Sequence, residues 1–260
     1  MEQRERVTIF HLYRRDGTAL FLHPFESLDK LISVLKRTDI VGKYGEEPRV
    51  ESLTLFRNDL YRMIEEAVRN WVAEVRFIPR FMLSAGAFLI TYLFFSFVVR
   101  DPLPWVDELL IGLGVAVAAY FLLSRKDQRS NMALKRRVQL RSAVDRIVFQ
   151  EDSFVRDIEA ALQKSESESR EKVLREMLSG IEDNFSIADE QEAQQLVGYL
   201  EKRFNSREYR KQEKLLAKAN TSTRAKRDVE VLNRWVESKK IDLSLFSVYR
   251  RVKKSYGRVK

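Results

Sequence analysis

The sequence predicts a mainly α-helical membrane protein: a two-helix transmembrane hairpin with a small N-terminal α/β element before it and a helical cytoplasmic C-terminal domain after it. Two runs of the sequence lead to this fold class. The first, residues 81–99, is nineteen residues long and contains no charged residue. The second, residues 105–123, is also nineteen residues long and has charged residues only near its start. At 1.5 Å per helical residue, nineteen residues cover about 28 Å, close to the ~30 Å hydrocarbon core of a bilayer.

The five residues between these runs predict a tight antiparallel hairpin. Pro102 and Pro104 keep this connection out of helical conformation, so both flanks of the hairpin fall on the same side. The alternative interpretation is a buried helical hairpin of a soluble protein.

The orientation of the hairpin follows from its basic residues, which resist translocation. The twenty residues before the first run contain four arginines (Arg62, Arg69, Arg76 and Arg80). Seven basic residues follow the second run within residues 125–141, and the loop contains only Arg100 as a basic residue. We therefore expect both termini in the cytoplasm and Trp105 at the outer interface. No signal segment opens the chain, so a bacterial inner membrane is favoured, with an organelle membrane as the alternative.

Composition excludes several kinds of chemistry. The 260 residues carry a net charge of +9 and contain no cysteine and two histidines, His11 and His23. Disulfide frameworks, thiolate nucleophiles, cysteine-ligated zinc and iron–sulfur clusters are therefore excluded. The nine glycines are scattered and form no phosphate-binding or dinucleotide-binding loop. We expect no cofactor, no metal site and no enzymatic activity, although an active site assembled from distant residues would leave no spacing to recognise.

Residues 1–50 predict the small α/β element. Two β-rich runs, residues 7–13 and 19–23, flank an Asp-Gly turn, which is a strong hairpin signal. Ser27 is a plausible N-cap for a helix over residues 28–36. Gly42, Gly45 and Pro48 then predict a loop.

Two amphipathic stalk helices are predicted on either side of the spans, over residues 51–80 and 125–163. In both, apolar residues recur at steps of three and four with charged residues between them. Pro79 predicts a kink or break where the first stalk enters its span.

Residues 164–260 predict the helical cytoplasmic domain. The polar run 164–170, Gly180 and residues 221–223 divide it into helices. Ser186 with Asp189 three residues later predicts a capping box for a helix to about Phe204. A last helix is expected over residues 241–256.

Charge changes sign within this domain. Residues 150–205 hold 7 basic and 14 acidic residues, whereas residues 206–260 hold 17 basic and 6 acidic ones. The basic C-terminus could pair with the acidic stretch or remain solvated, or it could bind anionic lipid; nucleic acid is the least expected partner. The residues assigned to anionic-lipid contact are Arg250, Arg251, Lys253, Lys254, Arg258 and Lys260.

Two groups of residues are candidates for roles within the second span. Gly112, Ala116 and Ala119 form a small-residue face on which another helix could pack closely. Trp105, Asp107 and Glu108 lie at its outer mouth. Converging copies of the two carboxylates could line a cation path; alternatively, they interact with the positive end of the helix dipole and remain in headgroup water.

The order of an α/β part, helix, span, acidic hairpin, span and helix is similar in topology to the mitochondrial calcium uniporter and its prokaryotic relatives, over about residues 50–165. In that family the mouth reads Trp-Asp-x-x-Glu-Pro. Here Trp105-Val106-Asp107-Glu108 places the carboxylates next to each other, roughly 100° apart around the helix. They cannot form two stacked rings one turn apart, so membership of that family is not inferred.

The function expected from these features is that of a non-enzymatic, membrane-anchored interaction protein that presents helical cytoplasmic domains to a protein partner or to anionic lipid. Besides the lipid bilayer, it would bind a protein or a second copy of the chain through amphipathic helices. The alternative is a homo-oligomeric cation channel with Asp107 and Glu108 at its entrance.

Overall fold

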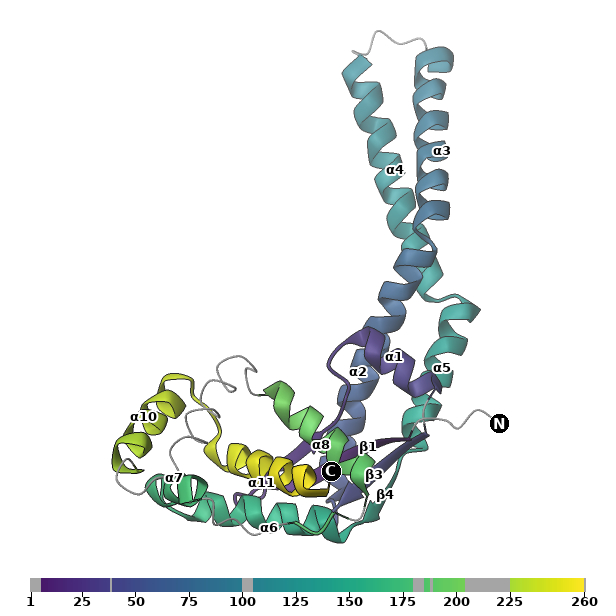
Figure 1. The fold of residues 1–260 in the computed structure, drawn as a ribbon. Coiled ribbons are helices and arrows are strands. Elements are labelled where there is room, and N and C mark those ends of the chain that lie inside the picture. Colours follow the sequence, from purple (N-terminus) through teal and green to yellow (C-terminus); the bar gives the residue numbers. More distant parts are fainter. Residues whose placement is uncertain are drawn as a thin grey trace. The chain divides into compact units, whose positions relative to one another are not determined.

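A computed structural model describes residues 6–37, 39–99, 105–179, 185–187, 189–203 and 225–259. Helices predominate, and the strands of the described residues form one four-stranded sheet (Figure 1). The chain divides into two compact units. Unit 1 comprises residues 1–26, 37–56 and 146–260, and unit 2 comprises residues 27–36 and 57–145. The mainly helical class predicted from the sequence is confirmed.

The sheet of unit 1 begins with the predicted hairpin. Strands β1 (Arg6–Tyr13) and β2 (Ala19–Leu22) pair antiparallel, with Phe10 opposite Leu22. Gly17 has a φ of 78°, a left-handed conformation that favours glycine, and its N–H donates to the Arg14 carbonyl at 2.9 Å. The Asp-Gly turn therefore fixes the register of the hairpin.

Two further strands were not expected. Strand β3 (Asp39–Tyr44) pairs in parallel with β1, and β4 (Val148–Glu151) pairs in parallel with β3, giving the order β2-β1-β3-β4. The loop predicted at Gly42 is therefore wrong, because Gly42 lies inside β3. Glycine at this position lets the Phe149 ring of β4 lie close to the backbone of β3, because a Cβ on Gly42 would be 2.4 Å from that ring.

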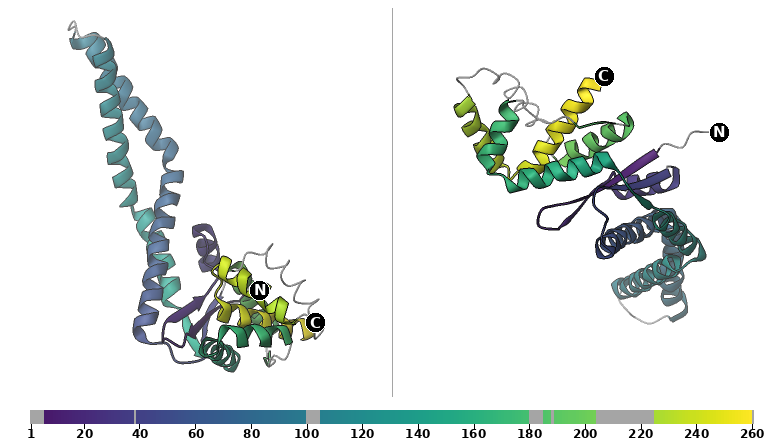
Figure 2. Two further views of the ribbon diagram at one scale, coloured as in Figure 1. Left: turned by 90° about the vertical axis from the view of Figure 1, so that its left-hand side faces the viewer. Right: turned by 90° about the horizontal axis from the view of Figure 1, so that it is seen from below.

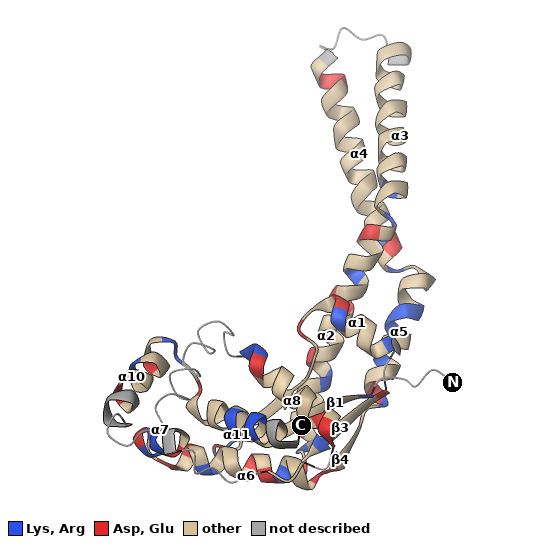
Figure 3. Cartoon of the chain, viewed as in Figure 1, with Lys and Arg blue, Asp and Glu red and all other residues tan. Residues whose placement is uncertain are grey.

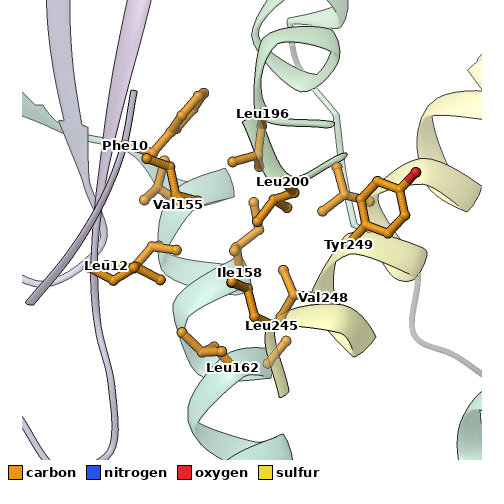
Figure 4. Close-up of a cluster of buried hydrophobic side chains, with 14 of the residues drawn as sticks. Phe10, Leu12, Val155, Ile158, Leu162, Leu196, Leu200, Leu245, Val248 and Tyr249 are labelled. Atoms are coloured by element: carbon orange, nitrogen blue, oxygen red, sulfur yellow. The ribbon is translucent and has the colours of Figure 1, made fainter. Parts of the chain in front are cut away.

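Helices α6 (Ser153–Ser167) and α8 (Glu190–Arg203) pack on the sheet, and α11 (Leu243–Val259) packs against these two helices (Figure 2). Alternate residues of β1 and β2, such as Leu12 and Leu22, point into the core that they form. Figure 4 shows the centre of this cluster, where Ile158 and Tyr249 are fully buried. The last predicted helix is therefore a structural part of the core.

Helices α7 (Arg170–Ser179) and α10 (Ala225–Ser238) pack together around Leu174 and Leu232. The polar break predicted over residues 164–170 is confirmed only at Glu168 and Ser169, because α6 continues to Ser167 and α7 begins at Arg170. The predicted breaks at Gly180 and at residues 221–223 lie outside the described residues. The predicted capping box is wrong in one respect, because Asp189 is itself the cap of α8: its carboxylate accepts the N–H of Gln191 at 2.9 Å.

Unit 2 contains α1 (Leu28–Arg37), most of α2 (Val50–Val75), α3 (Phe77–Phe94), the π-helical segment η1 (Phe95–Val99), α4 (Trp105–Gln128) and α5 (Asn131–Asp145). Helix α1 matches its prediction, and the Lys30 N–H donates to the Ser27 hydroxyl at 3.3 Å. The helix breaks at Arg76, three residues before Pro79. The break follows because proline cannot donate the next intrahelical hydrogen bond.

The single stalk helix predicted over residues 125–163 is wrong. Helix α4 ends at Gln128 in a tight turn in which the Ser130 N–H donates to the Asp127 carbonyl at 3.1 Å. Helix α5, strand β4 and α6 then follow separately. The strand forms because residues 148–151 pair with β3, a partner that local periodicity does not indicate.

Candidate functional site

Helices α3 and α4 lie side by side along their length (Figures 1 and 2). Figure 3 shows both helices with few charged residues between their ends. Within the described residues, Phe77–Phe97 and Val106–Gln128 are long and apolar enough to cross a membrane. Only 11% and 6% of their apolar windows are buried, so their outer side chains are not covered by protein.

The small-residue face of α4 lies toward α3. Gly112 is buried, and a Cβ at this position would lie 3.1 Å from the ring of Phe88. Ala116 and Ala119 are half-buried. Gly114 points elsewhere, because nothing lies within 4 Å of the position that its Cβ would take. The contact between the two helices thus uses the glycine that permits close approach.

The acidic mouth is the start of α4. Glu108 accepts a hydrogen bond from the Ser96 hydroxyl of η1 at 2.7 Å. Asp107 is half-buried and has no hydrogen-bond or ion-pair partner among the described residues. Both carboxylates lie in the first turn of α4, where the helix dipole favours negative charge. The side chain of Trp105 lies outside the described part of the chain.

At the opposite end of the hairpin, Arg80 joins three segments of unit 2. Its guanidinium donates to the Asp127 carboxylate at 2.8 Å, the Ser124 hydroxyl at 3.2 Å and the Val72 carbonyl at 3.0 Å. The side chain is only 3% exposed. The sequence identified Arg80 only as one of several basic residues that precede the first span, and no local signal indicated its contacts with α2 and α4.

The basic residues near the C-terminus are held within unit 1. The Arg250 guanidinium donates to the Met177 carbonyl at 2.8 Å, and buried Arg251 faces Glu176 of α7 at 3.5 Å. Lys253 donates to the Tyr249 hydroxyl at 3.3 Å, and Lys254 is half-buried. The side chain of Arg258 and all of Lys260 lie outside the described residues. The contact with Glu176 agrees with pairing to the acidic stretch.

Burial shifts the pKa of His11, His23 and Glu159 in unit 1. Burial lowers the pKa of His11 to about 4, and burial also lowers the pKa of His23. Burial raises the pKa of Glu159, although its carboxylate accepts the N–H groups of Tyr13 and Glu46 at 2.7 and 2.8 Å. The two histidines approach the same aromatic cluster around Phe56 and Phe21. No group of three metal-ligating side chains occurs in the described residues.

Lys43 forms ion pairs with two carboxylates of unit 1, and its side chain is only 14% exposed. Its ammonium donates to Asp152 at 2.7 Å and to Glu192. Burial lowers the pKa of Lys43, but the hydrogen bonds to both carboxylates outweigh burial and raise it. Since Asp152 is also the N-cap of α6, this ion triad joins β3 to the starts of α6 and α8.

A half-open cavity of about 440 Å³ lies between β2 and α8. Its cations are already engaged: Lys202 pairs with Glu26 at 2.9 Å, and Arg203 donates to the Phe21 carbonyl at 3.3 Å.

Comparison with protein-family models, with curated proteins and with solved structures finds no match. The continuous helix expected after the second span, on which the topological resemblance to the calcium uniporter family also depended, is replaced by α5, β4 and α6.

Proposed function

We propose that this chain is a non-enzymatic membrane protein in which the α3–α4 hairpin anchors unit 1 at the cytoplasmic face, as a surface for a protein partner or a second copy. The uncovered apolar surface of the two helices supports this proposal. Their outward side chains include Phe81, Leu110 and Phe121, each more than half exposed. Contact of so much apolar surface with water is unfavourable, and a bilayer removes it.

The chain offers a clean test of the anchor and its orientation, because it contains no cysteine. We expect the protein to resist alkaline carbonate extraction. In intact bacterial spheroplasts, a membrane-impermeant maleimide should label the variant Leu103→Cys in the hairpin loop. It should label Ser167→Cys, on the exposed end of α6, only after lysis. Release by carbonate would overturn the anchor, and the opposite labelling pattern would overturn the orientation.

A homo-oligomeric cation channel is the second candidate, favoured by the carboxylate of Asp107, which has no partner among the described residues. Native mass spectrometry in nanodiscs separates the two functions. A monomer or dimer supports the anchor, whereas a closed ring of four or more subunits would bring copies of Asp107 together. The channel further requires cation flux in liposomes that falls in the double variant Asp107→Asn, Glu108→Gln.

A further inference from the structure

Four basic side chains at the cytoplasmic end of the hairpin have no partner among the described residues. Arg125 and Lys126 lie in the last turn of α4, Arg129 in the following turn and Lys135 on α5. All four are exposed, and none forms an ion pair or hydrogen bond through its side chain within the described residues. Figure 3 shows the concentration of basic residues along α5.

The other basic residues of α5 are used within unit 2. Arg137 and Arg141 both pair with Glu65 of α2 at 2.8 Å. The guanidinium of Arg136 lies 3.8 Å from the ring centroid of Trp71. Contacts of this kind fasten α5 to α2, so they fix which side of α5 faces outward.

The outward side of α5 is also apolar. Leu134 and Val138, one turn apart, are 55% and 59% exposed, whereas Leu140 and Val144 on the opposite side are buried. Lys135 projects from the same outward side as Leu134 and Val138. One side of α5 is therefore packed within unit 2. The other side exposes a second apolar strip, Leu134 and Val138, next to the ammonium of Lys135.

The place of these side chains next to the second candidate span indicates which partner they bind. The second candidate span ends at Gln128, and α5 begins three residues later. A chain anchored by this span must therefore hold these side chains at the level of the lipid headgroups. Residues 125–141 contain seven basic residues and one acidic residue, which matches an anionic leaflet.

We propose that Arg125, Lys126, Arg129, Leu134, Lys135 and Val138 form a juxtamembrane surface that binds anionic phospholipids. The cations contact headgroup phosphates, and Leu134 and Val138 enter the adjoining acyl boundary. This proposal rests on the membrane anchor of the proposed function. It places the lipid contact next to the spans, in contrast to the C-terminal residues that the sequence suggested.

The test uses the full-length protein in nanodiscs of phosphatidylcholine, with and without 30% phosphatidylglycerol. Phosphatidylglycerol should slow amide hydrogen exchange over residues 125–141, and native mass spectrometry should find it retained over phosphatidylcholine. Changing the four free cations to Gln should abolish both effects, with each single change weakening retention by about fivefold. Raising the salt concentration to 0.5 M should have a similar effect on the parent.

The matched control removes the same charge elsewhere, by changing Arg170, Lys172, Arg175 and Arg234 of unit 1 to Gln; these exposed residues already pair with carboxylates. It should retain phosphatidylglycerol as the parent does. Equal loss in both quadruple variants, or none in the first, overturns the juxtamembrane surface. The same holds if inorganic phosphate alone protects residues 125–141. Release of the protein by alkaline carbonate would overturn the membrane anchor itself, so the two proposals are tested separately.

Discussion

The imidazole of His11 is buried in unit 1 among aromatic rings. Both ring nitrogens lack a hydrogen-bond partner within the described residues, and the ring packs edge-on against Tyr13 and Phe21 with centroids 4.5 and 4.8 Å away. The folded chain therefore binds the neutral form, and burial lowers the pKa of His11 from 6.5 to about 4. Since the unfolded chain takes up the proton first, this contribution to stability is complete above pH 6.5 and is lost as pH falls toward 4.

Replacing His11 by Phe should remove this acid sensitivity. The quantity to compare is the free energy of unfolding of the variant minus that of the parent. This difference should be about 2 kcal/mol larger at pH 5 than at pH 7.5. Trp235, which packs against Phe246 in unit 1, reports the transition in urea once Trp71 and Trp105 are changed to Phe. Parallel pH dependences in parent and variant would contradict the assignment.

Single residues also show where sequence reasoning stops. His11 was recognised from the sequence only as one of two histidines, without a prediction of its burial, and Glu159 resembled any charged residue of an amphipathic helix. The Glu159 carboxylate can be buried because it accepts hydrogen bonds from two backbone N–H groups, those of Tyr13 and Glu46. Those donors come from the ends of strands more than a hundred residues away in the chain, so no local pattern predicts the contact.

Among the elements, the locally determined ones were predictable. The β1–β2 hairpin, α1, the two apolar helices and α11 each carry their own turn, cap or periodicity. Strands β3 and β4 were missed because their pairing joins Gly42 to Phe149, and four-residue β4 has no side-chain pattern of its own. The continuous stalk was predicted in error for the same reason.

The contact between Gly42 and Phe149 should control the pairing of β3 with β4. The substitution Gly42→Ala places a methyl group where the Phe149 ring lies, and it should lower the free energy of unfolding by about 1–3 kcal/mol. Adding Phe149→Leu should restore part of this loss, because the smaller side chain vacates the space. Hydrogen exchange of residues 148–151 measures both changes; additive losses in the double variant would show that the two positions do not contact each other.

At the scale of the whole molecule, the two ends of the chain build one core. Unit 1 combines residues 1–26 and 37–56 with residues 146–260, so the candidate membrane hairpin is inserted between parts of a single folded unit. The change of charge along residues 150–260 fits this arrangement, since Arg251 of the basic part faces Glu176 of the acidic part. A linear view of the sequence separates these stretches and makes the C-terminus look like a tail.

Removal of the last helix should therefore unfold unit 1. A chain ending at Asp242 lacks Phe246, Tyr249 and Val252, which are fully buried, and exposes the faces of α6 and α8 that they cover. Loss of one large buried side chain alone costs about 3–5 kcal/mol. We expect the shortened chain to lose the protected amides of α6 and the native fluorescence of Trp235 while still resisting carbonate extraction. A chain ending at Tyr256 keeps the buried residues of α11 and should behave as the parent does; if the chain ending at Asp242 also retains protection in α6, the helix is dispensable for the core.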